Sequence, residues 1–272
     1  RSTLFPYTTL FRSLELEQRR ITRLALEAAG DEAGFALAGS GAIREHGLID
    51  RPTEDVDLFT VQQAETRFGT SLDRIIAALH AAGYTVETRR RQDTFARLTI
   101  VSAQGRSTDM DLGVDWRAHP PVRLEVGPVL AIDDAVGNKV GALFSRAETR
   151  DYLDVDAIRR SGRYSDKELL ILARKADAGF DLGWFAQNLD HVERIQPEEV
   201  RAYGLTASQL DDVKTRTKAW AASIRGLTRR ESTRSGLHER IEREVERRRA
   251  ERGDDEPHRA PKIGRASCRE RV

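Results

Sequence analysis

The sequence has almost no cysteine: Cys268 is the one example among 272 residues. It lies in the final run IGRASCRERV, which resembles a translated sequencing adapter, as does the first run, RSTLFPYTTLFRS. The region between these runs therefore offers no disulfide, no zinc–thiolate site and no cysteine nucleophile. We expect residues 1–13 and 263–272 to be adapter-derived and to play no part in the fold.

A large charge excess and a long apolar run are also missing. The two terminal runs hold five arginines and one glutamate, so residues 14–262 have 40 basic and 43 acidic side chains and a formal charge of −3. This balance gives no sign of a nucleic-acid-binding protein. No apolar segment approaches the roughly 20 residues that a membrane-spanning helix needs. We therefore expect a cytoplasmic protein without membrane contact.

The remaining 249 residues divide into an α/β part and a helical part. Short apolar runs such as Val56–Thr60 and Ala96–Val101 predict strands up to about Val129. Helical spacing then dominates, from Asp133–Arg146 to Ala207–Ile224. The predicted organisation is a mixed-sheet α/β (α+β) domain over 14–129, a helical domain over 130–228 and a charged tail over 229–262.

The most informative motif is Gly39-Ser40, separated by fourteen residues from Asp55-Val56-Asp57. Strand alternation places both aspartates on one face and turns Val56 into the core. Close carboxylates repel one another unless a cation lies between them, and Mg²⁺ prefers such oxygen ligands and is often shared with substrate phosphates. The Gly-Ser turn, at a strand–helix junction, offers N–H groups and a hydroxyl to a triphosphate.

The D-x-D pattern alone is a weak signal, because Asp109–Asp111 and Asp154–Asp156 repeat it and such patterns are more often solvated turns or caps. The order of strand, Gly-Ser turn, helix and D-x-D strand is more specific. Arg51 and Thr53 flank the second strand and could contact phosphate. Further along, Lys139 and Arg146 share one face of a predicted helix, where long basic side chains often only extend into solvent.

The segment FALAGSGAIREHGLIDRPTEDVDLF resembles the polymerase-β-type nucleotidyltransferase superfamily and, more narrowly, the AbiEii/AbiGii toxin family. The segments DLGVDWRAHPP and GNKVGALFSRAETRDYLDVDAI extend the similarity, which covers about residues 35–162. The resemblance implies a polymerase-β-like domain followed by a helical domain. It also implies transfer of a nucleoside monophosphate from a nucleoside triphosphate (NTP) to an acceptor hydroxyl, with two Mg²⁺ ions. The implied acceptor is RNA, notably the tRNA 3′ end, and the implied partner is a separately encoded antitoxin.

The resemblance also implies roles for individual residues. Asp55 and Asp57 match the metal ligands, and a third carboxylate follows on a later strand. Asp111 is preferred for it, since the Asp-Leu-Gly that starts there resembles the family strand, and Asp109 is the alternative. Lys139 matches a lysine that contacts the triphosphate or the transferring phosphoryl group. Asp154 matches the last residue of an RD-x-x-D motif and would orient Lys139 or the acceptor. The candidate nucleotide-binding residues are Gly39, Ser40, Arg51, Thr53 and Arg146.

Two other functions fit the same residues. The acceptor could be a small molecule such as an aminoglycoside, for which we expect a shallow, acidic cleft, whereas RNA requires a basic one. The protein could instead be a regulatory module that binds nucleotide without turnover, although a binding module needs no second metal ion. The run Arg89-Arg90-Arg91 could contact an RNA backbone or only solvent.

Overall fold

The structure is a computed structural model that describes residues 6–51, 53 and 55–252. The chain divides into two compact units, Arg1–Arg225 and Gly226–Val272. The first unit contains the sheet and every helix that borders the site. The second contains the C-terminal part of helix α9 (Ala207–Arg252), where arginine and glutamate alternate with few apolar residues.

A mixed seven-stranded sheet forms within the described part of the first unit, as predicted. Its strand order is β3-β4-β5-β2-β1-β7-β6. Strand β5 runs antiparallel to β4 and parallel to β2, so it joins the β3–β4 hairpin to the D-x-D strand. The strands are β1 (Ala36–Leu37), β2 (Asp55–Thr60), β3 (Thr85–Arg91), β4 (Phe95–Val101), β5 (Ser107–Val114), β6 (Val122–Leu124) and β7 (Gly127–Val129).

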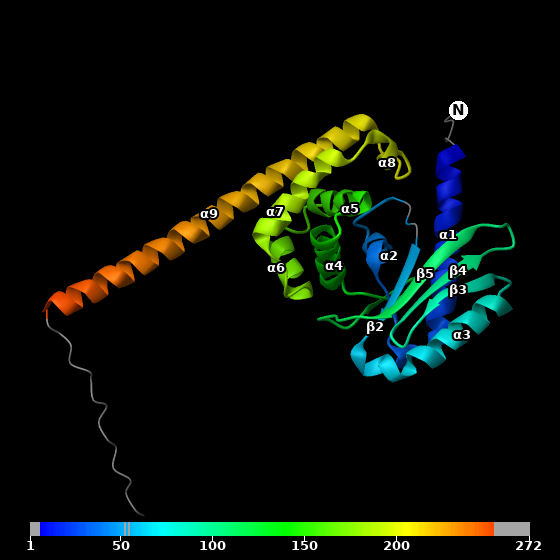
Figure 1. Ribbon diagram of the computed structural model, residues 1–272. Coiled ribbons are helices and arrows are strands. Elements are labelled where there is room, and N and C mark those ends of the chain that lie inside the picture. The colour runs from blue at the N-terminus through cyan, green and yellow to red at the C-terminus, as the bar shows by residue number, and fades with distance from the viewer. Residues whose placement is uncertain (1–5, 52, 54, 253–272) are drawn as a thin grey trace, which may run out of the picture. The chain divides into compact units, whose positions relative to one another are not determined.

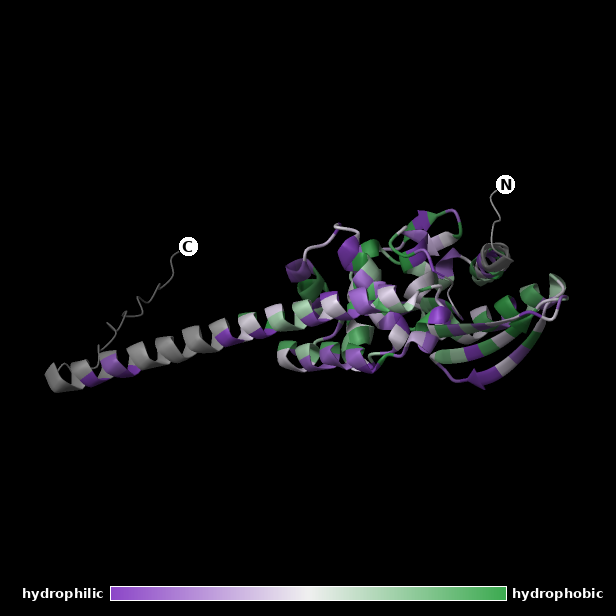
Figure 2. Cartoon of the chain, turned by 90° about the horizontal axis from the view of Figure 1, so that it is seen from above, coloured by the Kyte–Doolittle hydropathy of each residue, from purple (hydrophilic) through white to green (hydrophobic). Residues whose placement is uncertain are grey.

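Alternation divides the central strands into a core face and an open face. On β2, Val56 and Leu58 are almost completely buried, while Asp55, Asp57 and Phe59 are partly exposed. Helices α1 (Pro6–Ala29) and α3 (Phe68–Ala81) lie along the core face (Figure 1). Figure 2 shows the alternation of hydrophilic and hydrophobic residues along the strands. The opposite face is therefore available for polar side chains.

Helices follow the sheet, as predicted, and group beside α2 (Figure 1). Helices α4 and α6 pack closely, and a Cβ atom on Gly137 would lie 2.9 Å from the backbone oxygen of Leu172. This close approach fixes α4, the helix that contains Lys139. The helices are α2 (Gly39–Glu45), α4 (Ile132–Ser145), α5 (Thr149–Arg160), α6 (Asp166–Ala176), α7 (Leu182–Asp190) and α8 (Pro197–Arg201).

The predicted domain limits remain predictions, although the last strand, β7, ends at the proposed boundary near Val129. Of the two adapter-like runs, residues 6–13 belong to α1, while residues 1–5 and 263–272 lie outside the described residues. The end of the predicted tail, 253–262, lies outside them as well. Among the helices that the structure describes, none has the length and apolar character to span a membrane.

The α4–α6 contact yields a stability prediction. Gly137→Ala would place a methyl group against the Leu172 carbonyl, and we expect it to lower the free energy of unfolding by about 1–3 kcal/mol. Gly141→Ala, on the same helix with open space around the new methyl group, should instead raise it by up to about 1 kcal/mol. Urea unfolding of the two variants measures both effects, and equal effects would contradict the described packing.

Candidate functional site

Four aspartates meet on the open face of the sheet. Asp55 and Asp57 alternate with Val56 on β2, as predicted. Strand β5 pairs Asp109 with Asp55 and Asp111 with Asp57. Since β2 and β5 are adjacent parallel strands about 4.8 Å apart, the two D-x-D patterns form a block of four carboxylates.

The carboxyl group of Asp57 is strongly perturbed. Desolvation, followed by the charges of Asp55 and Asp111, raises the pKa of Asp57 to about 7, against the opposing effect of Lys139 and nearby arginine. A Cβ atom on Gly39 would overlap Asp57 Oδ2, and Gly39 adopts a φ of 55° that residues with side chains rarely adopt. The Gly-Ser turn therefore requires glycine so that the Asp57 carboxylate can lie against it.

Two arginines that sequence reasoning missed pair with these acids. Arg97 on β4 donates two hydrogen bonds to Asp111, each of 2.6 Å. Arg150, at the start of α5, lies 3.3 Å from Asp55 Oδ2. Arg150 could have been suspected, because it is the arginine of the RD-x-x-D motif. Arg97 had no such signal, because its role depends on the register between β4 and β5.

The two candidates for the third carboxylate have different surroundings. Asp111 is the direct cross-strand partner of Asp57 and raises its pKa. Asp109 lies opposite Asp55 and accepts a hydrogen bond of 2.7 Å from Thr99 Oγ1. This arrangement favours Asp111 as the third carboxylate, and its role remains a prediction.

Lys139 lies beneath Ser40 rather than in solvent. Its ammonium contacts Ser40 Oγ at 3.0 Å, Asp154 Oδ2 at 3.0 Å and Asp151 Oδ1 at 3.3 Å. Lys139 is 5% exposed and both aspartates are fully buried. The three ammonium donors thus each have an acceptor. Because its charge lowers the pKa of Asp57, Lys139 lies close enough to the carboxylate block to act on it electrostatically.

Asp154 also holds Arg51 in place. The Arg51 guanidinium donates to both Asp154 oxygens, at 2.6 and 2.7 Å, and to Ser40 Oγ at 3.1 Å. The Ser40 hydroxyl donates in turn to Asp154 Oδ2 at 3.0 Å. Since this hydroxyl is engaged inside the protein, the turn offers an anion its backbone N–H groups.

Arg146 and Arg150 border the site on the helical side. Arg146 donates two hydrogen bonds to Asp151, at 2.9 and 3.1 Å, and this pairing raises the pKa of Arg146. Its side chain is 45% exposed, so the guanidinium reaches solvent. Arg150 lies between Asp55 and Glu148. Together with Lys139, these side chains place three positive charges opposite the carboxylate block.

Of the predicted site residues, Thr53 is the one whose side chain does not join the cluster around the carboxylates, Ser40 and Lys139. Its hydroxyl donates to Gln18 Oε1 at 2.8 Å and accepts from Arg44 Nη1 at 3.1 Å. Thr53 is 2% exposed. In this structure it connects α1 to the loop that precedes β2.

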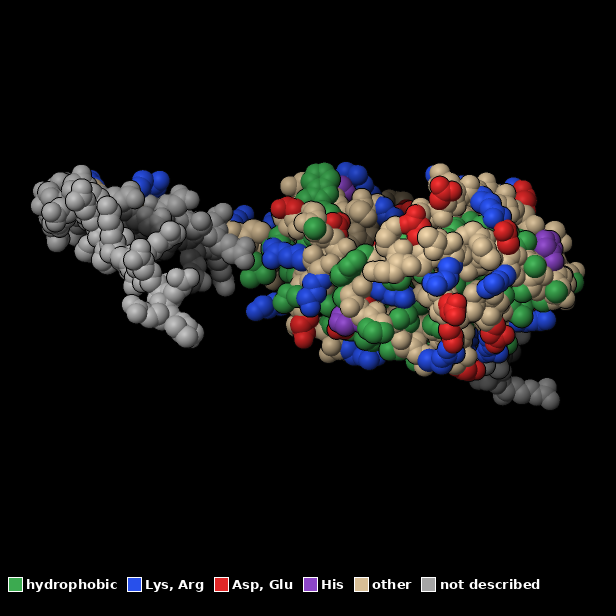
Figure 3. Space-filling model, turned by 90° about the horizontal axis from the view of Figure 1, so that it is seen from below, with side chains coloured by type: hydrophobic (Ala, Val, Ile, Leu, Met, Phe, Trp, Pro, Cys, Tyr) green, Lys and Arg blue, Asp and Glu red, His purple; other side chains and the backbone are tan. Residues whose placement is uncertain are grey.

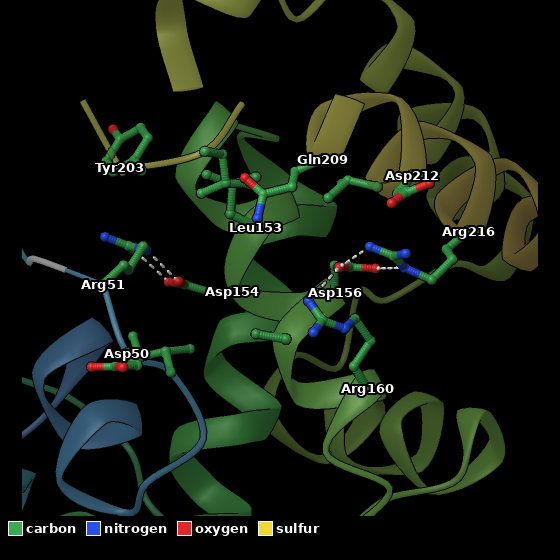
Figure 4. Close-up of a pocket in the computed structure, with 15 residues that line it drawn as sticks. Asp50, Arg51, Leu153, Asp154, Asp156, Arg160, Tyr203, Gln209, Asp212 and Arg216 are labelled. Carbon is green, nitrogen blue, oxygen red and sulfur yellow. Dashed lines mark hydrogen bonds and ion pairs between the residues drawn. The ribbon is translucent and has the colours of Figure 1, made fainter. Parts of the chain in front are cut away.

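A pocket of about 470 Å³ adjoins Arg51 and Asp154 (Figure 4). Arg51 lies 5.1 Å from the centre of the Tyr203 ring on one side. On the other side, Arg216 donates hydrogen bonds of 2.7 and 2.8 Å to Asp156. None of the four carboxylates of β2 and β5 lines this pocket, so the candidate site is the open face of the sheet.

The donor set fits a divalent cation. Desolvation and the repulsion from Asp55 and Asp111 raise the pKa of Asp57, and a cation between Asp55 and Asp57 would relieve that repulsion. Within the described residues, no three acidic, histidine or cysteine side chains are gathered closely enough to hold a metal ion, and Asp111 is turned toward Arg97. Each carboxylate oxygen has two lone pairs, so the pair with Arg97 leaves Asp111 able to accept a cation.

A family model described as "Nucleotidyl transferase AbiEii toxin, Type IV TA system" matches residues 23–251. This range includes all the site residues described above. The comparison with curated proteins gave no significant match.

Two solved structures from Helicobacter pylori are similar in fold. JHP933 is 16% identical, with a TM-score of 0.53, and the match covers 87% of this chain and 100% of that chain. A putative nucleotidyltransferase is 17% identical, with a TM-score of 0.50, and the match covers 77% of this chain and 93% of that chain. At these identities the similarity shows the fold alone.

The raised pKa of Asp57 predicts how stability depends on pH. A carboxyl group whose pKa is about 7 in the folded chain and about 3.9 in the unfolded chain stabilises the fold most below pH 4. That contribution falls as the pH rises and is lost above about pH 7. Asp57→Asn should therefore flatten the decline in melting temperature between pH 4 and pH 7 in a chelating buffer. The control is Asp109→Asn, which removes the carboxylate opposite Asp55; a wild-type profile for Asp57→Asn would contradict the prediction.

Proposed function

The chain belongs to the AbiEii nucleotidyltransferase toxin family of type IV toxin–antitoxin systems and is therefore an enzyme that transfers nucleotides; from this we propose that it uses Mg²⁺ to move a nucleoside monophosphate from an NTP to a hydroxyl group of RNA. The observation that most supports this proposal is the register of β2 and β5, which places Asp57 beside Asp55 and opposite Asp111. Three carboxylates on one face of the sheet, next to a glycine turn, suit metal-assisted phosphoryl transfer.

In this proposal Asp55, Asp57 and Asp111 hold the metal ions. When bound there, Mg²⁺ lowers the pKa of the attacking hydroxyl and offsets charge on the leaving pyrophosphate. Asp57 has to be ionised to serve as a ligand, and Arg97 has to share Asp111 or move away from it. The charge of Arg97 is then available to a substrate phosphate.

The helical side supplies the positive charge that the triphosphate requires. Lys139, Arg146 and Arg150 surround the carboxylates, and preorganised cations are most effective where negative charge develops in the transition state. Asp151 and Asp154 position Lys139, so we assign them as positioning residues. The backbone N–H groups of Gly39 and Ser40 would receive phosphate oxygens at the turn.

An RNA acceptor, specifically the tRNA 3′ end, is proposed from the resemblance to the toxin family. The structure supports it over a small-molecule acceptor through Arg89, Arg90 and Arg97, which place basic side chains beside the carboxylates. The type IV family also implies an antitoxin, which we propose is separately encoded.

Metal-ligand variants test the transfer reaction. Asp57→Asn and Asp111→Asn should each reduce nucleotide transfer at least about a thousandfold, since losing a ligand removes several kcal/mol of transition-state stabilisation. Asp109→Asn should retain most activity, because Asp109 is not a ligand in this account. The measurement is incorporation of label from each of the four NTPs into total tRNA, with Mg²⁺ present or chelated. Transfer by Asp57→Asn at the wild-type rate would rule out the assignment.

A further inference from the structure

Two consecutive arginines of β3 reach the open face of the sheet. The register between β3 and β4 shifts between Thr88 and Arg90, which leaves Arg89 as an extra residue. Such a bulge redirects side chains that simple alternation would send to opposite faces. Arg89 Nε donates to Thr99 Oγ1 at 3.2 Å, and Arg89 Nη1 forms an ion pair of 2.5 Å with Glu87 of the same strand. The Arg90 guanidinium lies 5.4 Å from the centre of the Phe95 ring. Thr99 and Phe95 both occupy open-face positions of β4.

The next arginine, Arg91, points to the other side of the sheet. It donates hydrogen bonds of 2.7 and 3.1 Å to Asp73 of α3. The side of the molecule on which α3 lies in Figure 1 is seen in Figure 3, where acidic and basic side chains are interspersed. Among the described residues seen on that side, acidic side chains interrupt the basic ones. Because of the bulge, the side chains of Arg89 and Arg90 lie on the face with the carboxylates, and the side chain of Arg91 lies on the other face.

Strand register aligns these arginines with the carboxylate block. Arg90 pairs with Arg97, which pairs with Asp111, which pairs with Asp57. Three strand spacings, about 14 Å, separate the first member of this row from the last. The row changes from positive to negative charge toward the proposed metal site. This order suits a polyanionic substrate, because the positive side chains would attract its phosphates and the negative ones would hold the metal ion at its end.

Aromatic rings lie next to this row. Phe95 is two residues from Arg97 and faces the same side, and its cross-strand partner is Gly113. The absence of a side chain there leaves room for the Phe59 ring, 3.2 Å from the position of a Cβ atom on Gly113. Unpaired bases stack on such rings and on arginine planes, whereas the bases of a duplex are not accessible.

We propose that Arg89, Arg90, Phe95 and Arg97 form an acceptor surface for single-stranded RNA. The arginines contact backbone phosphates and Phe95 stacks on an unpaired base, so that the terminal hydroxyl lies at the carboxylate block. Charge complementarity favours this occupant, because the surface combines three guanidinium groups with a ring and leads directly to Asp57. Arg89 is paired with Glu87 and Arg97 with Asp111, so each would share its charge between that carboxylate and a phosphate. The inference rests on the proposed function, since it names the surface that holds the acceptor for that reaction.

Binding of a labelled single-stranded RNA to the full chain tests the acceptor surface without turnover. Arg89→Ala with Arg90→Ala should weaken binding at least about tenfold and reduce the slope of log affinity against log salt by about 1.4, from two lost phosphate contacts. Phe95→Ala should weaken binding at least about fivefold with an unchanged salt slope, because it removes stacking. Arg91→Ala is the matched control from the same strand and should leave affinity within twofold. Melting temperatures verify that each variant is folded.

The outcomes separate this inference from the proposed function. If the wild type binds and labels RNA but the Arg89/Arg90 variant binds as well as Arg91→Ala, the acceptor surface is wrong and the proposed function stands. Equal affinity for a blunt duplex of the same length would also overturn it, since stacking needs unpaired bases. If the wild type labels a small molecule but no RNA, both the RNA acceptor and the acceptor surface fail.

Discussion

The crowding of negative charge on one face of β2 and β5 is the constraint on which the site depends. Desolvation of Asp57, together with the charges of Asp55 and Asp111, raises the pKa of Asp57, so keeping this carboxylate ionised has a cost. The fold tolerates this cost because cationic side chains from β4, α4 and α5 surround the acids. A divalent cation would relieve this repulsion, which is why we propose that one binds here.

A buried ion network holds the side chains of Lys139, Arg146 and Arg51 in place. Asp151 and Asp154 are fully buried, and they accept from Lys139, Arg146 and Arg51. Burying charges is costly unless they are paired and hydrogen-bonded. Removing one partner leaves an uncompensated buried charge, which destabilises the fold. The network therefore couples the Gly-Ser turn to α4 and α5, so the position of Lys139 depends on residues that contact no substrate.

Local sequence patterns correctly predicted the features that depend only on residues close together in the chain. Alternation around Val56 was sufficient to place Asp55 and Asp57 on one face, and the mixed sheet followed by helices was predicted correctly. Strands β6 and β7, of three residues each, are too short to produce a periodic signal. The pairing of Arg97 with Asp111 depends on register across two strands and could not be predicted. For Thr53, only the tertiary structure shows that its hydroxyl contacts Gln18 and Arg44.

The central claim is that the carboxylates of β2 and β5 form a divalent-cation site. Its most direct test is anomalous diffraction from crystals of the full chain grown with Mn²⁺ and a non-hydrolysable NTP analogue. Our account predicts an anomalous peak between Asp55 and Asp57, a second metal shared with Asp111, and displacement of the Arg97 guanidinium from that carboxylate. Bound nucleotide without an anomalous peak at these residues, or with the peak at Asp109 alone, would contradict it.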